Sequence, residues 1–180
     1  MYYFLIASLP LLEIGAAAPL TTADFDEMLA ETLPESGKRA IFSCTGVGNF
    51  PDTCRVYREM AAFETYLRTR IAQKRAERAG IAFTPADPEA YFSEVDFGLA
   101  QASSCANPLE REFIVDRLRW ARLDELALGH DFDFDALCIY RTKLFIVNKY
   151  NNFRKESGMV NFAAALEKTV GAADKSAKEA

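Results

Sequence analysis

The chain has 180 residues, of which 50% are hydrophobic and 12% are aromatic, and its formal net charge is -5. This much apolar surface can fill the core of one ordinary domain or two small ones, which argues against a disordered chain. The acidic balance gives no overall attraction for nucleic acid, so we expect no nucleic-acid partner.

The N-terminal run MYYFLIASLPLL is apolar and is followed by three alanines at positions 16–18, as in a secretory signal peptide. However, no Lys or Arg precedes the run, and Pro10 and Glu13 cut it short, which departs from the signal pattern. The run is also shorter than the roughly 20 apolar residues that span a membrane. We therefore expect a structured and buried N-terminal segment, either a short strand or the first turns of a core helix. A secreted helical binding protein is the alternative.

A first helix is predicted from about Ala23 to Thr32, because Thr21 or Thr22 can cap it and Pro34 ends it. Residues 35–51 hold a short apolar run at 40–42 and then a stretch rich in small side chains at 43–49, and are predicted to form a loop with at most one short strand. A G-x-G within this loop lacks the third glycine of the dinucleotide-binding fingerprint.

A long helix is predicted from about Thr53 to Ala79, with Asp52 as its cap and Gly80 as its stop. Its first half carries an apolar stripe that Glu64 interrupts. Its second half is basic, through Arg68, Arg70, Lys74, Arg75 and Arg78. A helix that loses its apolar stripe leaves the core. The basic half is either a solvated helix end, whose cations suit the negative dipole terminus, or a patch that docks on an acidic partner.

The segment from Gly80 to Pro88 is the one candidate hinge in the chain. A helix is predicted to follow from Pro88 to Ala102, because Tyr91, Val95 and Leu99 recur at intervals of four residues.

The run NPLE at positions 107–110 is the clearest helix start in the sequence. Asn107 can cap the helix, proline suits the first helical position, and Glu110 can reach back to the cap. This helix is predicted to reach Leu128, because Gly129 then ends it. Its predicted inward-facing residues are Ile114, Leu118 and Ala121.

The last long helix is predicted from Phe134 to Arg154, and its centre is apolar nearly all round, which is typical of a helix surrounded by protein. Arg141 is the exception in this apolar stretch. We expect it to lie at a core edge or to pair with an internal acid such as Asp124 or Glu125. The alternative is that Arg141 makes a recognition contact with a partner.

These elements predict an all-α fold, an irregular bundle of about five to six helices. One helical domain is expected over residues 1–170, with a shorter last helix from Met159 to Val170. The tail at 171–180 has few large apolar residues and is predicted to be flexible.

Two candidate sites for chemistry fail on their spacing. The alternating carboxylates at 131–135 imitate a calcium loop, but Ala136 and Thr142 stand where an EF-hand needs glycine and glutamate. Asp131 and Asp133 are therefore predicted to cap the following helix. His130 is the only histidine, and no nucleophile motif accompanies it.

The cysteines also show no motif, because none of them forms a C-x-x-C pair or has zinc-ligand spacing. We read all four as small buried hydrophobic residues in a reducing compartment: Cys44, Cys54, Cys105 and Cys138. No Walker sequence is present either. We therefore expect no catalytic, cofactor-binding or metal-binding residues. The alternative, a small uncharacterised enzyme, requires His130, Asp131 and an arginine to converge around a cavity.

Three stretches of the sequence carry a resemblance to a known family. These are the opening MYYFLIASLPLL, the helix around 138–143 (CIYRTK) and the asparagine-rich turn at 150–154 (YNNFR). Together they resemble a bacterial family of unknown function that is encoded among the genes of V-type ATPases. The matching motifs are apolar and aromatic, and no functional residues transfer with them.

The resemblance implies a cytoplasmic, non-catalytic subunit or assembly partner of a V-type rotary ATPase. One implied role is that of the all-α funnel subunit, called C or d, which seats the central stalk on the membrane ring. The partners would be the other ATPase subunits, and the protein would reach the membrane only through the complex. At 180 residues the chain is short for a funnel of three helical bundles.

Overall fold

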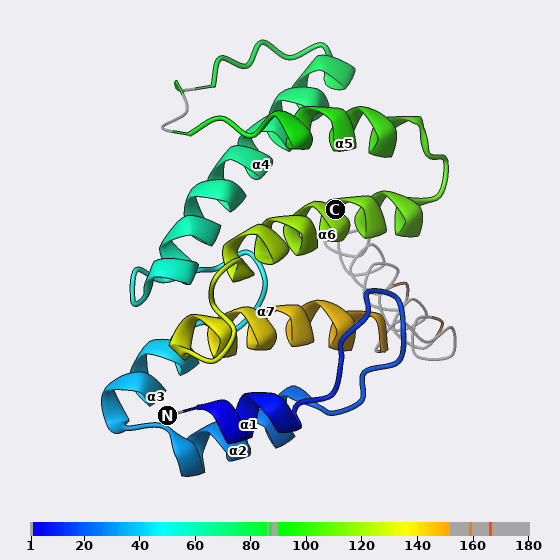
Figure 1. Cartoon of the computed structure of the whole chain (residues 1–180). Coiled ribbons are helices and arrows are strands. Elements are labelled where there is room, and N and C mark those ends of the chain that lie inside the picture. The colour runs from blue at the N-terminus through cyan, green and yellow to red at the C-terminus, as the bar shows by residue number, and fades with distance from the viewer. Residues whose placement is uncertain (1, 86, 88–89, 152–158, 160–165, 167–180) are drawn as a thin grey trace, which may run out of the picture.

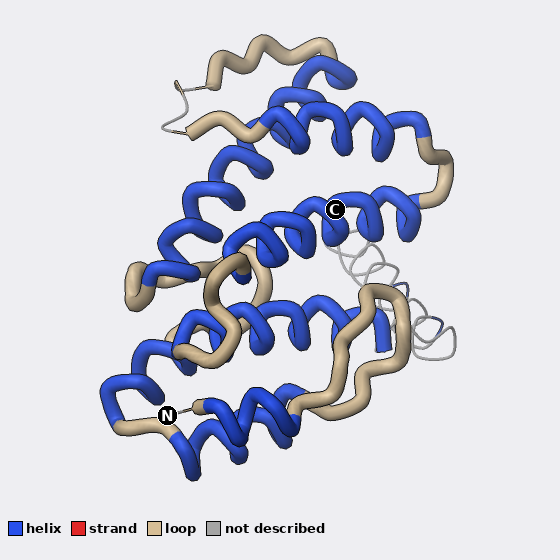
Figure 2. The backbone as a smooth tube through the Cα atoms, in the orientation of Figure 1, coloured by secondary structure: helices blue, strands red, loops and turns tan. Residues whose placement is uncertain are grey.

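The computed structural model describes residues 2–85, 87, 90–151, 159 and 166. Within this part of the chain it contains seven helices and no strand, which confirms the all-α prediction (Figure 2). The helices are α1 (Tyr3–Ser8), α2 (Thr22–Thr32), α3 (Glu35–Phe42), α4 (Arg55–Ala79), α5 (Ser93–Ser104), α6 (Pro108–Ala127) and α7 (Phe134–Asn151). The predicted helix at Met159–Val170 and the tail at 171–180 lie outside the described residues.

Helix α7 lies in the middle of the molecule (Figure 1). It contacts α2 on one side and both α4 and α6 on the other, while α5 packs on α4 and α6. Protein on both sides explains why the sequence of α7 is apolar nearly all round, as predicted. Its buried apolar residues are Leu137, Cys138, Ile139, Leu144, Ile146 and Val147.

Three predicted helix ends are confirmed. Thr21 and Asp24 form a reciprocal capping box at the start of α2, and hydrogen bonds from Thr21 lower the pKa of the Asp24 carboxyl. The Asn107 side chain accepts a hydrogen bond from the backbone N–H of Leu109. Helix α4 stops at Gly80, which has φ +67°, a left-handed conformation that glycine adopts at low cost.

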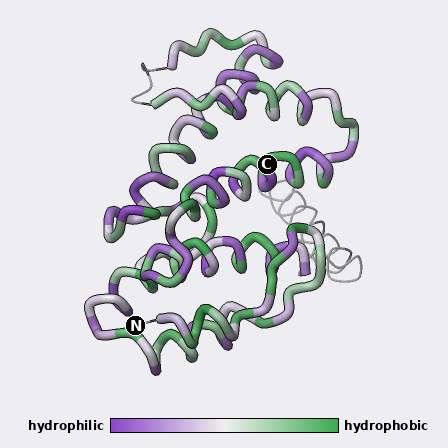
Figure 3. Tube along the Cα trace, viewed as in Figure 1, coloured by the Kyte–Doolittle hydropathy of each residue, from purple (hydrophilic) through white to green (hydrophobic). Residues whose placement is uncertain are grey.

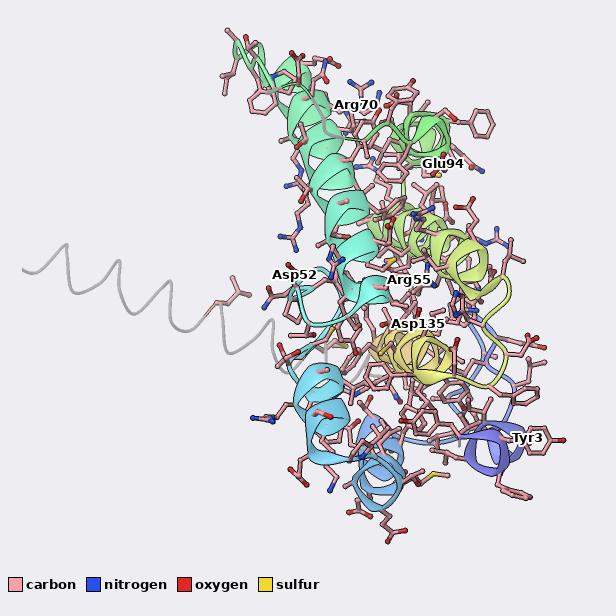
Figure 4. All side chains as sticks on the ribbon, turned by 60° about the vertical axis from the view of Figure 1, so that its left-hand side comes forward. Tyr3, Asp52, Arg55, Arg70, Glu94 and Asp135 are labelled. Atoms are coloured by element: carbon pink, nitrogen blue, oxygen red, sulfur yellow. The ribbon has the colours of Figure 1, made fainter. Side chains whose placement is uncertain are left out.

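The N-terminal segment differs from its prediction. Residues 3–8 form a helix, so the alternative of a short strand is wrong, and no residue of α1 is fully buried. Phe4 is 86% exposed, and Figure 4 shows Tyr3 pointing away from the body of the protein. Only Leu5 and Ile6 of this helix pack against the core. A run that is apolar at almost every position does not reveal which side faces inward, so the predicted burial failed.

Helix α3 was predicted as a loop, and it accounts for the extra helix. Pro34 occupies the position before its first residue, and Glu35 stands in its first turn, where a carboxylate suits the helix dipole. Gly37 weakens local helix propensity, but Ile41 is completely buried and its carbonyl accepts a hydrogen bond from the hydroxyl of Tyr57. Tertiary packing therefore outweighs the local composition.

The start of α4 also corrects the prediction. Its N-cap residue is Cys54, whereas Asp52 forms an ion pair with Arg58 at 2.7 Å. Asp52 lies two residues before the N-cap Cys54, and its carboxylate pairs with Arg58 instead of accepting from the N–H groups of the first turn.

The remaining differences concern which side chains face inward. Helix α5 begins at Ser93, later than the predicted Pro88, and Tyr91 is 70% exposed while Val95 and Leu99 are buried. In α6, Ala121 is exposed. The buried residues of α6 are Val115, Asp116, Leu123 and Leu126. The inward face of α6 was hard to recognise in the sequence because it includes a charged residue, Asp116, which is buried.

Candidate functional site

The two halves of α4 have different surroundings. All of its buried residues lie between positions 56 and 67, and none of the following residues of the helix is fully buried. Figure 3 shows this second half as mostly hydrophilic. The second half therefore leaves the core, as its sequence predicts, and its side chains are available for other contacts.

The basic residues predicted as one patch lie on two faces of α4. Arg70 points toward α5 and forms an ion pair with Asp96 at 2.5 Å (Figure 4). Arg68 and Arg75 are two helical turns apart and lie on the other face, which also carries Lys74 and Arg78. Only these four of the five predicted residues come together.

A groove of about 770 Å³ lies between the second half of α4 and the facing sides of α5 and α6. We call it the basic groove. Its apolar lining consists of Ile71, Ala72, Ala76, Ala79, Ile81, Leu99, Ala102 and Val115. Its charged lining consists of two carboxylates, Glu64 and Glu112, and of six cations, Arg68, Lys74, Arg75, Arg78, Arg111 and Arg119. An apolar strip bordered by cations suits an amphipathic segment with acidic flanks.

The cations of the basic groove differ in what they already bind. Arg68 donates to Glu64 at 3.0 Å and to the backbone carbonyl of Gly48. Arg78 and Arg111 donate to backbone carbonyls at 3.3 and 2.7 Å. Lys74 and Arg75 make no ion pair with any described residue. These two residues therefore offer uncompensated positive charge.

A buried ion network lies under one end of the basic groove. Arg119 donates two hydrogen bonds to the Glu64 carboxylate, at 2.9 and 2.8 Å, and one to Asp116 at 2.7 Å. Asp116 is completely buried and also accepts from Lys149 Nζ and Tyr150 Oη, each at 2.7 Å. Three helices, α4, α6 and α7, are thereby fixed relative to one another.

The carboxylates of this network stabilise the charged form of Arg119. Burial opposes the charged form of Arg119, but its hydrogen bonds and ion pairs with Glu64 and Asp116 raise the pKa of the guanidinium. Burial, together with the hydrogen bond to Asp116, raises the pKa of Tyr150. The network therefore supports the groove by tying α4, α6 and α7 together beneath it.

Arg141, the other predicted contact residue, is buried and only 4% exposed. Its guanidinium makes two hydrogen bonds to Asp26, at 2.7 and 2.8 Å, and donates to the backbone carbonyls of Ile41 and Cys44. Burial opposes ionisation, yet Asp26 raises the pKa of Arg141. This side chain joins α7 to α2 and to the end of α3.

Arg141 does pair with an internal acid, as predicted, but neither of the two acids named as examples is its partner. Asp124 pairs with Lys143, and Glu125 pairs with Arg122 at 3.0 Å. Sequence proximity favoured these acids, whereas the actual partner stands 115 residues away in α2.

The histidine and its neighbouring carboxylates do not form a cavity site. His130 contacts Asp133 at 2.5 Å and Asp135 at 3.7 Å. Asp133 accepts from the N–H of Ala136 at 3.0 Å, which confirms it as a cap, while Asp131 has no such bond. Burial alone would raise the pKa of the Asp133 carboxyl. The hydrogen bond with His130 and those from backbone N–H groups together outweigh this effect, so the pKa is lowered. Neither of the two cavities described here is lined by His130 or Asp131.

A second cavity, of about 730 Å³, lies on the opposite face of α4, and we call it the tyrosine cavity. Arg70, Tyr66 and Tyr91 converge on Asp96 at its edge, with the two hydroxyls 3.2 and 3.4 Å from the carboxylate. Burial and the nearby Asp96 charge raise the pKa of Tyr66 to about 12.

The cysteines agree with the prediction only in part. Cys44 and Cys138 are buried, but Cys54 and Cys105 are partly exposed. Both partly exposed cysteines cap helices, Cys54 at the start of α4 and Cys105 at the end of α5, where the chain enters a loop.

The part of the chain that the structure describes contains neither a grouped set of metal ligands nor a membrane-spanning helix. Among these residues, no set of three or more metal-binding side chains is grouped to hold an ion. No described helix has the length and apolarity needed to cross a bilayer. Comparison with protein-family models, with curated proteins and with solved structures gave no match.

Proposed function

We propose that this protein is a non-catalytic subunit or assembly partner of a V-type rotary ATPase, and that it binds an acidic segment of another subunit in the basic groove. The complex is proposed from the resemblance of the opening run and of the segments at 138–143 and 150–154. The role of joining the central stalk to the membrane ring belongs to the same proposal.

The binding mode is proposed from two cations that have no ion pair among the described residues and that lie beside an apolar strip. Lys74 and Arg75 lack ion pairs among the described residues, while Ile71 and Val115 contribute apolar lining next to them. Acidic side chains on a partner would gain charge pairing there, and its apolar face would lose contact with water. An extended or helical segment fits a groove of this size better than a compact domain does.

The buried ion network beneath the groove favours a groove that is already formed before the partner binds. Glu64 and Arg119 line the groove and also belong to the buried ion network, so α4 and α6 are held at a fixed separation. A preformed groove loses little conformational entropy when a partner binds.

The test is affinity purification of the tagged protein from its native host. One variant carries Lys74→Glu and Arg75→Glu. A matched variant carries Lys38→Glu and Arg39→Glu on α3, which makes the same change in charge outside the groove. We expect ATPase subunits to co-purify with the wild type and with the α3 variant, and to be lost from the groove variant.

Two results would count against this proposal. Absence of ATPase subunits from the wild-type sample would remove the V-type ATPase role. Equal recovery with the groove variant would keep the complex but assign the contact to another surface.

The tyrosine cavity favours a second candidate, a small enzyme or ligand-binding protein. Ionisable groups converge at its edge, as such a site requires, although Asp96 is already held by Arg70 and Tyr66. A small anion that displaced Asp96 from Arg70 would be the ligand class to test. Thermal stabilisation by carboxylate or phosphate compounds that Arg70→Met abolishes would support this candidate over the binding subunit.

A further inference from the structure

Three of the four cysteines gather where α4 begins. Cys54 is the N-cap residue of α4, Cys138 lies in α7, and Cys44 lies in the loop after α3, close enough to interact electrostatically with Cys54. The sulfur atoms of Cys54 and Cys138 are 3.7 Å apart, within hydrogen-bond distance, although the residues are 84 positions apart in the chain.

The two paired thiols have opposite properties. Cys54 is partly exposed, whereas Cys138 is completely buried. The hydrogen bond between Cys54 and Cys138, aided by the backbone N–H groups of Tyr57 and Val56, outweighs burial and lowers the pKa of Cys54 to about 7. The same hydrogen bond and burial raise the pKa of Cys138. Cys54 thus resembles an attacking cysteine and Cys138 a resolving one.

We propose that Cys54 and Cys138 form a reversible intramolecular disulfide, with Cys54 attacking a peroxide and Cys138 resolving the product. In the first step the Cys54 thiolate forms an S–O bond as the peroxide O–O bond breaks. The products are a sulfenic acid at Cys54 and a hydroxide or alkoxide, which takes up a proton.

In the second step the Cys138 sulfur attacks the Cys54 sulfur. The S–S bond forms as the S–O bond breaks, and the departing hydroxide combines with the thiol proton of Cys138 to give water. Overall, two thiols lose two electrons and two protons to one peroxide, which becomes water and an alcohol, or two waters from hydrogen peroxide.

The surroundings allow the sulfurs to approach. A disulfide needs an S–S distance of about 2.05 Å, so the gap must close by roughly 1.7 Å. Cys138 is held within α7, whereas Cys54 follows the turn at 52–53 and joins α4 as its N-cap residue, through its carbonyl, which accepts a hydrogen bond from the N–H of Arg58 at 3.1 Å. Arg55 and Asp135, paired at 2.7 Å beside the thiols, keep the start of α4 against α7 (Figure 4).

The bond would connect the N-terminal end of α4 to α7 and close a loop between residues 84 positions apart. Such a long loop gives a disulfide a large effect on the unfolded chain. This inference is independent of the proposed function, because neither thiol lines the basic groove.

The experiment treats the reduced full-length protein with hydrogen peroxide and maps its peptides without reduction. We expect free thiols to fall from four to two, a Cys54–Cys138 linked peptide, and a rise in Tm of roughly 5–15 °C that dithiothreitol reverses. Alkylation of Cys54 by iodoacetamide should reach half its maximal rate near pH 7.

The variants separate the two roles. Cys138→Ala should leave a sulfenic acid at Cys54 that dimedone traps, and Cys54→Ser should abolish peroxide-dependent loss of thiols. Cys105→Ser, the control at the other partly exposed cysteine, should form the disulfide as the wild type does. A predominant link through Cys44 or Cys105, or four thiols remaining in the treated wild type, would overturn the proposal. The wild-type peptide map decides this even if a variant fails to fold.

Discussion

The two halves of α4 belong to one continuous helix, but the first half packs in the core and the second half lines a surface groove. The first half, up to Leu67, packs into the core with residues such as Phe63 and Met60, which are completely buried. The second half lines most of the α4 side of the basic groove, whereas the tyrosine cavity lies along both halves, from Arg58 to Arg70. Glu64, which is buried near the end of the first half, joins the core to the groove through its ion pair with Arg119.

The difference shows how one element can serve both stability and binding. Burial of apolar area stabilises the fold and strongly restricts which residues the first half tolerates. The second half is restricted mainly by charge and by its helical conformation. We therefore expect substitutions in the first half to change stability, and substitutions in the second half to change binding.

The largest effect is expected from Phe63→Ala. Removing a completely buried phenylalanine leaves a cavity and should lower the free energy of unfolding by about 4 kcal/mol. The matched control is Ile71→Ala, two turns further along α4, where the side chain is only partly buried and the loss should be about 1 kcal/mol. Urea denaturation followed by circular dichroism measures both. Equal losses of unfolding free energy in the two variants would show that the two halves of α4 do not differ in their contribution to stability.

A loss of about 3 kcal/mol is expected from Arg119→Met, because the buried carboxylates of Glu64 and Asp116 lose their shared cation. Adding Glu64→Leu to the same chain should restore part of the stability, since it removes one uncompensated charge. The double variant is compared with both single variants by urea denaturation. A double variant less stable than Arg119→Met alone would mean that packing, and not charge, is what the arginine supplies.

A smaller loss, about 1 kcal/mol, is expected from Gly80→Ala at the end of α4. The residue has φ +67° and no atom lies within 4 Å of an added Cβ, so the cost is conformational. Gly80→Asn should cost less, because asparagine tolerates the left-handed region better than alanine does. Thermal unfolding of the two variants checks this order, and the reverse order would contradict it.

The smallest effect on stability is expected from Lys74→Glu with Arg75→Glu. Neither residue has an ion pair among those described, so the free energy of unfolding should change by no more than about 0.5 kcal/mol. Chemical denaturation of this variant also validates its use in the binding test. A loss above about 1 kcal/mol would mean that the second half of α4 contributes to the core after all.

Local signals in the sequence predicted much of this structure. The caps at Thr21 and Asn107 and the stop at Gly80 lie where they were expected, because capping depends on a few neighbouring residues. The loss of the apolar stripe correctly placed the second half of α4 outside the core. Helix α3 was missed, since its stability comes from burying Ile41 against distant elements.

The candidate sites were predicted less well. The sequence identified the basic residues of α4 but could not divide Arg70 from the others, because that division depends on where α5 and α6 pack. The pair of Cys54 and Cys138 had no sequence signal, since no spacing motif joins residues 84 positions apart.

By itself, the sequence determined the helical class, the main helix ends and the absence of recognised catalytic motifs, because these follow from periodicity and short-range patterns. Tertiary structure alone decided the partners of the buried charges. Arg141 meets Asp26 and Arg119 meets Glu64 only because the chain brings separate helices together. A buried charge must find its counterion somewhere in the fold, but its identity depends on packing and not on position in the chain.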